Sequence, residues 1–176
     1  MFRSESILLR SYWVTLVMDV FSRRLIGFGV EPAPIDGVSV CRMFNHATAG
    51  QFKPKRLSTD HDPLFRFHRS LANLRALEVD EIKSVPYAPV SHPFVEGLIG
   101  TARREYLDRV FFWNKLDLVR KLNDFRHYYN ANRVHRSPDG TTPTIRADWP
   151  FPILATLQHF AWKQHCCGQF QLPVAA

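Results

Sequence analysis

The chain has 176 residues, of which 45% are hydrophobic and 22% charged, so it can bury a core and is not disordered as a whole. It carries 23 Lys and Arg against 16 Asp and Glu, giving a net charge of +7. A surface this basic usually meets a polyanion, most often nucleic acid, although a basic enzyme without such a partner has the same composition. Three cysteines are too few for a disulfide framework, and neither a signal peptide nor a membrane span is expected.

Strands and helices alternate in the first half of the chain. Runs of β-branched and aromatic residues predict strands, and apolar spacing near 3.6 residues predicts helices. The expected strands are residues 7–9, 12–20, 25–30, 54–58 and 81–85, and the expected helices are 38–49 and 67–77. The short polar turn at 22–24 makes 12–20 and 25–30 an antiparallel pair. This order predicts a mixed α/β layer fold.

Two longer helices are expected in the second half. Pro93 suits the first turn of a helix, which then runs over residues 94–111. A second helix over 116–132 has one apolar stripe, formed by Leu118, Leu122, Phe125 and Tyr129. The aromatic tail after Asp148 is expected to pack on the core. We expect Trp13, Phe28, Phe125 and Tyr128 to be core residues rather than platforms for nucleic-acid bases.

Two acidic residues stand at positions where they can meet. Asp60 follows a short strand, and Glu96 lies in the first turn of the helix that begins near Pro93. Carboxylates at a strand end and on a nearby helix can converge on Mg²⁺, which prefers hard oxygen ligands. Two such ions can activate a hydroxyl and stabilise the leaving oxygen in phosphodiester chemistry. Two acids at such a spacing are, however, more often solvated surface groups.

The helix around Glu96 also carries cations. Glu96, Gly100 and Arg103 share one face on a 3.6-residue repeat, with Arg104 beside it, so these cations could lie along a nucleic-acid backbone. The alternative is a salt-bridged surface helix, because acidic residues follow nearby. Gly97 and Gly100 lower helix propensity, which favours a reason of packing or of close approach for them.

Four segments in order resemble insertion-sequence transposases related to retroviral integrases. They are the strand pair at 12–28, the Asp60 segment at 58–65, the Glu96 segment at 89–101 and the ending from Tyr129-Asn130 to Thr142-Pro143. The resemblance covers about residues 2–146. It implies an RNase H-like fold, a mixed β-sheet flanked by helices, with a three-acid, two-metal active site that cuts and joins DNA. Residues 1–146 would form this core and 147–176 a C-terminal extension.

The chain departs from the family pattern at its start. The family's first catalytic aspartate would fall just before Met1, so we expect an N-terminally truncated core with most of the first strand missing. Asp19 matches another position, where the acid is not usually a metal ligand. As an alternative to ligating metal, Asp19 can bond to backbone groups or to Arg23. Gly97 replaces a residue that is commonly Arg in the family.

The resemblance implies DNA integration or transposition by metal-assisted phosphoryl transfer, with Asp60 and Glu96 holding Mg²⁺ or Mn²⁺. Because the third acid is absent, we expect little strand transfer by this chain alone. The alternative is a non-catalytic remnant that binds DNA or oligomerises and modulates a full-length transposase. A third reading is a gene fragment of marginal stability. The expected partners are DNA (element ends and target) and a second copy or a full-length transposase, with no membrane, in the bacterial cytosol or nucleoid.

Basic residues near the four motifs are the expected phosphate contacts. They are Lys53, Lys55, Arg56, Lys83, Arg103, Arg104, Arg133 and Arg136. Histidines in or beside the motifs could assist them, or simply occupy polar loops; they are His61, His92 and His135. The group His159, His165, Cys166 and Cys167 lacks the Cys-x₂₋₄-Cys spacing of zinc sites, so no zinc is expected there.

Overall fold

The computed structural model describes residues 1–50, 54–59, 64, 68–83, 93–133 and 160–175. The strands are β1 (Phe2–Glu5), β2 (Ser11–Met18), β3 (Leu25–Pro32), β4 (Arg56–Thr59), β5 (Asp80–Lys83), β6 (Phe160–His165) and β7 (Phe170–Ala175). The helices are α1 (Gly37–Thr48), α2 (His68–Ala76), α3 (Pro93–Thr101) and α4 (Lys115–Ala131). A π-helical turn, η1 (Ala102–Tyr106), and a 3-10 turn, η2 (Leu107–Arg109), follow α3. None of the described helices has the length and apolar composition that a bilayer crossing needs.

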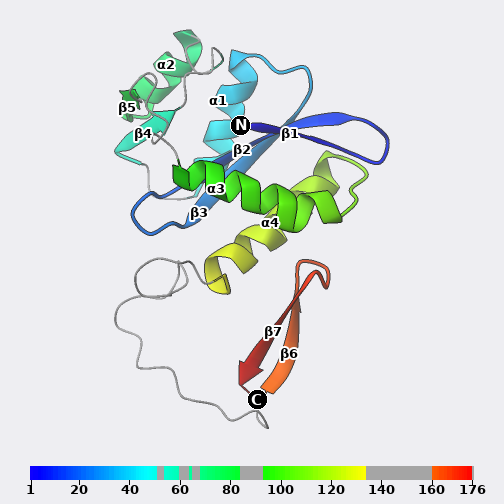
Figure 1. Cartoon of the computed structure of the whole chain (residues 1–176). Coiled ribbons are helices and arrows are strands. Elements are labelled where there is room, and N and C mark those ends of the chain that lie inside the picture. The colour runs from blue at the N-terminus through cyan, green and yellow to red at the C-terminus, as the bar shows by residue number, and fades with distance from the viewer. Residues whose placement is uncertain (51–53, 60–63, 65–67, 84–92, 134–159, 176) are drawn as a thin grey trace.

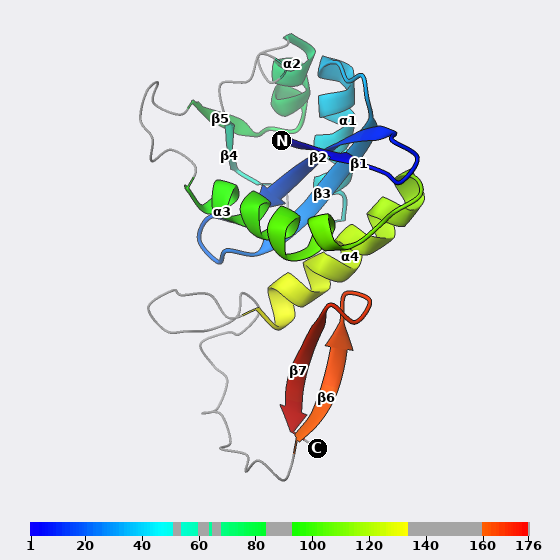
Figure 2. The ribbon, with the colours of Figure 1, turned by 45° about the vertical axis from the view of Figure 1, so that its right-hand side comes forward.

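The described strands form three small sheets rather than one. β1, β2 and β3 make an antiparallel sheet in that order, β4 pairs with β5 in parallel, and β6 pairs with β7 as a hairpin (Figure 1). Parallel and antiparallel pairing are both present, as the sequence predicted, but no described strand joins β2 to β4. The N-terminus lies beside β2, on the side of β4 and β5 (Figure 2).

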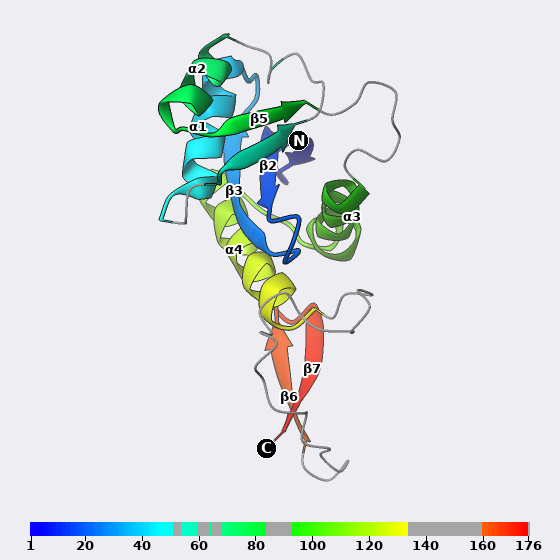
Figure 3. The ribbon, with the colours of Figure 1, turned by 90° about the vertical axis from the view of Figure 1, so that its left-hand side faces the viewer.

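The two faces of β2 pack against different helices. Val14 and Leu16 belong to the main core, together with Leu98 of α3 and Leu118 of α4. Thr15 and Val17 point to the other face, because successive strand residues alternate, and Thr15 meets α1 there. Figure 3 shows the result as layers, with α1 and α3 on opposite sides of the strands.

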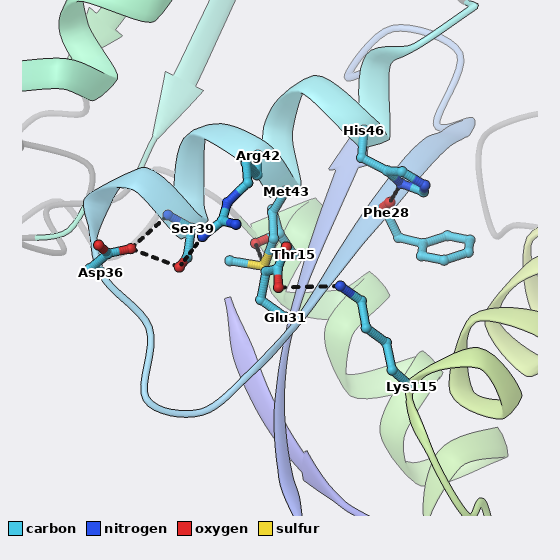
Figure 4. Close-up of polar contacts among 9 residues, drawn as sticks. All are labelled: Thr15, Phe28, Glu31, Asp36, Ser39, Arg42, Met43, His46 and Lys115. Atoms are coloured by element: carbon cyan, nitrogen blue, oxygen red, sulfur yellow. Dashed lines mark hydrogen bonds and ion pairs between the residues drawn. The ribbon is translucent and has the colours of Figure 1, made fainter.

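Glycines let α1 lie very close to β3. A Cβ on Gly27 would stand 1.9 Å from the carbonyl oxygen of Ala47, and one on Gly29 would stand 2.4 Å from Cβ of Met43. The approach is therefore backbone against backbone, which only glycine permits. Polar contacts hold the same interface: Thr15 Oγ1 donates to Met43 Sδ over 3.7 Å (Figure 4).

The ends of α1 are fixed by side chains. Asp36 caps the N-terminus by accepting a 2.8 Å hydrogen bond from the Ser39 N–H (Figure 4). Near the C-terminus, Nδ1 of His46 lies 3.1 Å from the Phe28 carbonyl oxygen, so the helix is tied to β3 at that end as well.

Helix α4 supplies the apolar stripe that its spacing predicts. Leu118, Leu122 and Phe125 are fully buried, and Tyr129 is 4% exposed. Asn114 caps the helix by accepting from the Asp117 N–H at 3.0 Å. At the other end, the rings of Tyr128 and Phe170 stack with centroids 4.1 Å apart, which brings the β6–β7 hairpin against the core.

Several sequence predictions need correction. Residues 7–9 are not a strand: they lie in the β1–β2 connection, are exposed, and Leu9 has a φ of 56°. The strand lies earlier, at β1, because its register with β2 pairs Phe2 with Val14. Residues 19 and 20 are a turn instead of strand, and Trp13 is half-buried rather than in the core. The expected helix over 94–111 changes to a π-helical turn at Ala102.

Candidate metal and nucleic-acid site

A cavity of about 760 Å³ lies in the strand layer between β2 and β4. Its walls come from α1 on one side and from α3 on the other, and β5, α2 and Met1 also line it. The apolar lining includes Leu16, Phe44, Leu57 and Ile99, and carboxylates, arginines and hydroxyls also line the cavity. Concave sites of this kind, apolar with a few polar groups, are where ligands usually bind.

Glu96 lines this cavity from the first turn of α3. The residue is exposed, and no hydrogen bond or ion pair to its carboxylate is found among the described residues. The first turn of a helix favours an anion, because its free N–H groups point toward it. Glu96 is therefore a carboxylate that is held in place by its helix and is open to a ligand from the cavity.

Asp60, the other predicted metal ligand, lies outside the described residues. Thr59, the residue before it, ends β4 and lines the same cavity as Glu96. Thr59 Oγ1 donates a 3.1 Å hydrogen bond to Glu81 Oε1, so Glu81 is already engaged by a protein group. The strand that leads to Asp60 and the helix that carries Glu96 thus border one cavity, while the position of the Asp60 carboxylate stays a prediction.

Asp19 also lines the cavity, but its carboxylate closes its own turn. It accepts from the N–H groups of Phe21 and Ser22, at 3.3 and 3.0 Å, and from the Ser22 hydroxyl. Partial burial acts to raise the pKa of Asp19, yet these hydrogen bonds outweigh it, so the pKa lies below 3.8. The structure favours the backbone-bonding interpretation of Asp19 over a ligand role; its partners are backbone groups and Ser22, rather than Arg23.

Arg103 and Arg104 lie in the π-helical turn and are both exposed. The wider turn begins only at Ala102, so the shared face predicted for Glu96 and Arg103 stays a prediction. The guanidinium of Arg104 instead lies beside Gly100, where an added Cβ would stand 2.9 Å from its Nη2 atom. Gly97, in contrast, has no described atom within 4 Å of the position of an added Cβ, so packing within the described residues does not explain it and close approach by a partner stays a prediction.

Arg133 makes its contacts within the protein. It forms an ion pair with Glu105 at 2.8 Å and lies over the ring of Tyr129, 6.0 Å from its centroid. Its neighbour in the motif, Asn130, is buried and bonds both to the N–H and to the carbonyl of Leu25 at 2.9 Å. This part of the ending motif therefore has a structural reason: it fastens the end of α4 to the start of β3 and to η1.

The remaining predicted contacts divide between described and undescribed positions. Lys55 and Arg56 are exposed at the start of β4, and Arg56 lines the cavity. The side chain of Lys83, and all of Lys53, Arg136, His61, His92 and His135, lie outside the described residues. Sequence reasoning did not single out Arg24 or Glu81, which also line the cavity; only the three-dimensional pairing of β4 with β5 brings Glu81 there.

The part of the chain that the structure describes holds no group of three or more His, Cys, Asp or Glu that could bind a metal. This includes His165, Cys166 and Cys167 of the hairpin turn, while His159 is not described. Burial raises the pKa of Cys166 to about 12, so its sulfur is a protonated thiol in the absence of a metal.

Comparison with known proteins finds integrase cores and an insertion-element protein among those that this chain resembles. Residues 78–143 match the family described as Integrase core domain, a stretch that contains Glu96, Arg103 and Arg104 but not Asp60. The insertion element IS476 uncharacterized 39.2 kDa protein of Xanthomonas euvesicatoria is 27% identical over 121 residues. Those residues are 69% of this chain and 35% of that protein, so the chain spans about a third of its curated relative.

Solved structures give the fold. The catalytic core domain of BIV integrase has a TM-score of 0.54 at 17% identity, covering 81% of this chain and 88% of that one. The HTLV-2 integrase catalytic core domain in complex with magnesium reaches 0.58 at 18% identity with the same coverage. A simian T-cell lymphotropic virus intasome chain reaches 0.64 at 16% identity, covering 92% of this chain and 59% of that one. The predicted RNase H-like α/β fold and the resemblance to transposase and integrase cores are confirmed.

Proposed function

We propose that the chain is the catalytic core of a DNA transposase or integrase, in which Asp60 and Glu96 hold Mg²⁺ or Mn²⁺. The observation that carries the proposal is the shared cavity: Glu96 and Thr59, next to Asp60, line it together. Of the described carboxylates on this cavity, Asp19 and Glu81 are engaged by protein hydrogen bonds, whereas Glu96 is open. The match over residues 78–143 supports the assignment.

The donor set fits a magnesium site in kind, because carboxylate oxygens are the ligands that Mg²⁺ takes from proteins. When bound, the ion would supply a Lewis acid for phosphodiester cleavage and joining. Glu96 is fixed by α3, so its role is to hold a negative oxygen at the cavity rim. The structure of the HTLV-2 core with magnesium supports the same cation for this fold.

DNA would approach over the exposed cations near this rim. Arg56 lines the cavity, Lys55 precedes it, and Arg103 and Arg104 are exposed one turn beyond α3. Phosphate contacts of this kind set affinity and its salt dependence. We propose Lys53, Lys83 and Arg136 as further contacts, and Arg133 as a weaker one, because Glu105 already neutralises part of its charge.

We further propose that strand joining by this chain alone is slow, because the described residues place only Glu96 as an open carboxylate at the cavity. The test is metal-dependent nicking of supercoiled plasmid DNA by the purified chain. Slow nicking in excess Mn²⁺ is expected, reduced at least about tenfold by Glu96→Gln or by Asp60→Asn. Asp108→Asn, which removes an exposed carboxylate from η2, is the matched control and should change nothing.

The outcomes are distinct. Nicking that survives both Glu96→Gln and Asp60→Asn would contradict the assignment of these ligands. No nicking at all, with salt-sensitive DNA binding that Asp60→Asn leaves unchanged, would replace the proposal with the non-catalytic DNA-binding alternative.

A further inference from the structure

Arg23 reaches from the connection between β2 and β3 to the first turn of α3. Its guanidinium carbon lies over the ring of Phe94, 3.0 Å from the ring centroid. Phe94 is the second residue of α3 and stands two positions before Glu96. The connection lies beside the start of this helix in both views (Figure 1, Figure 2). A cation over an aromatic face is attracted by the negative charge of that face, so the contact joins two segments that are far apart in the chain.

The ring of Phe94 is the contact that explains where the Arg23 guanidinium lies. Arg23 is half-buried, and its Nη1 atom is buried without a hydrogen-bond partner among the described residues. No ion pair in the described part of the chain includes Arg23. A guanidinium that is drawn out of water without an ion-pair partner gains its stabilisation from the aromatic face.

The backbone of Arg23 is fixed by its own turn. Its φ of 61° lies in the left-handed region, which is unfavourable for a residue with a side chain unless the surrounding structure holds it there. The Asp19 carboxylate provides this support by accepting from the N–H groups of Phe21 and Ser22, and the Asp19 N–H donates to the Arg24 carbonyl over 2.9 Å. Arg23 therefore extends toward α3 from a turn that hydrogen bonds close.

The first turn of α3 has little other support. Residues 94–97 are exposed or half-buried, and the exposed fraction of Phe94 is 47%. The first fully buried side chain described in this helix is Leu98. The opening turn of a helix also lacks part of its backbone hydrogen bonding, so it unfolds locally unless contacts from outside the helix hold it. Glu96 lies within this turn and lines the cavity, so its direction depends on such a contact.

We propose that Arg23 is a positioning residue for Glu96. Its guanidinium holds Phe94 and thereby the first turn of α3, which keeps the Glu96 carboxylate at the cavity. The inference rests on the proposed metal site, because Glu96 is the ligand to be positioned there. It also gives a role to the turn that Asp19 closes: this turn supports the site through Arg23, without a bond from Asp19 to the metal.

The sign of the change in metal affinity separates positioning from the simple effect of a nearby charge. A positive charge close to a metal site repels the metal ion, so loss of the Arg23 charge alone would strengthen Mn²⁺ binding. Loss of positioning would weaken Mn²⁺ binding, because a ligand that samples several directions must be ordered before it binds.

The test measures two properties of the full chain: hydrogen exchange of the Gly97 and Leu98 amides without metal, and Mn²⁺ affinity from paramagnetic broadening. Arg23→Gln and Phe94→Leu should each speed exchange at these amides and weaken Mn²⁺ binding about fivefold, which is within the contribution of a cation over a ring. Arg23→Lys keeps a cation for the ring and should retain most of both properties. Arg10→Gln, which removes an exposed charge from the β1–β2 connection, is the matched control.

The double variant Arg23→Gln/Phe94→Leu should lose no more than either single variant, because both changes remove the same contact. The proposal would be overturned by unchanged exchange at Gly97 in both single variants, by stronger Mn²⁺ binding in Arg23→Gln, or by full additivity in the double variant. Equally accelerated exchange at Leu122, in the core of α4, would also overturn it, because the loss of stability would then be general. A wild type that binds no Mn²⁺ at Glu96, with the exchange effect intact, would support the contact with α3 and contradict the proposed function.

Discussion

The two edges of β2 present opposite situations within one strand. On the edge toward β3, pairing runs from Tyr12 to Met18, and the glycines of β3 bring the backbone of α1 to within contact distance. On the other edge, the described pairing with β1 ends at Phe2 and Val14, and a cavity lined by apolar groups and carboxylates lies beyond it. Tight packing and an open cavity are therefore separated by the width of one strand.

Substitutions in these two regions are expected to affect different properties of the protein. Where β3 packs on α1, beside the edge of β2 that is paired with β3, there is no space for additional side-chain atoms. Substitutions by larger residues there are expected to lower the free energy of unfolding. Glu96, which borders the cavity from α3, is exposed and has no hydrogen bond or ion pair among the described residues, so its substitution is expected to change ligand binding with little effect on stability.

The largest effect is expected from Gly27→Ala on the closed edge. The added Cβ would stand 1.9 Å from the carbonyl oxygen and 2.8 Å from the carbonyl carbon of Ala47, which are backbone atoms that cannot rotate away. We expect a loss of about 3 kcal/mol in the free energy of unfolding, measured by urea denaturation. A loss below about 0.5 kcal/mol would show that α1 and β3 are not in backbone contact.

A somewhat smaller loss is expected from Asn130→Ala, which frees the N–H and the carbonyl of Leu25 at the start of β3. Leaving both buried groups without this partner should cost about 2 kcal/mol. Asn130→Asp keeps an acceptor for the Leu25 N–H and loses the donor to the Leu25 carbonyl. Its free energy of unfolding should therefore lie between those of the wild type and of Asn130→Ala. If DNA affinity fell while the free energy of unfolding stayed constant in both variants, the structural role would be contradicted.

Gly97→Ala is expected to have the opposite sign, because no described atom outside its own helix backbone lies within 4 Å of the position its Cβ would take. Alanine has a higher helix propensity, so the free energy of unfolding should increase by about 0.5–1 kcal/mol. The same denaturation experiment measures it beside Gly27→Ala. A destabilised Gly97→Ala would mean that this face of α3 is covered.

The smallest effect is expected from Asp19→Asn. The pKa of Asp19 lies below 3.8 in the folded chain, so its charge stabilises the fold above that pH, and this contribution is lost as the pH falls through the lower folded value. Near neutral pH the free energy of unfolding of the wild type should exceed that of the variant by less than about 1 kcal/mol. This difference in free energy should vanish in acid. Denaturation curves at about pH 6, 4 and 3 test this; a constant difference would exclude the carboxylate as its source.

Local patterns predicted the parts of the fold that depend on neighbours along the chain. The stripe of α4 and the bounds of α1, α2 and β5 follow from apolar spacing within a few residues. The 7–9 segment misled the prediction, because Ile7, Leu8 and Leu9 have strand-like composition but the pairing register of β1 leaves them in an exposed turn. The π-helical turn and the separation of the sheets depend on packing between distant segments, which spacing does not encode.

In the candidate site too, features set by the local sequence were predicted, and contacts between distant residues were not. The sequence identified Glu96 from its place in a helix, and the structure puts it at a cavity. It missed the pairing of Arg133 with Glu105, 28 residues earlier, because both look like free surface charges in the sequence. Asp60 stays a prediction, supported by the cavity position of Thr59.

The convergence of Asp60 and Glu96 on one divalent ion is tested most directly by paramagnetic broadening with Mn²⁺, which detects even weak binding. In NMR spectra of the full chain, we expect substoichiometric Mn²⁺ to broaden selectively the amide signals of Thr59 and Gly97. Glu96→Gln and Asp60→Asn should each abolish this broadening, and Asp108→Asn should leave it intact. Broadening centred elsewhere, or unchanged in both carboxylate variants, would contradict the account.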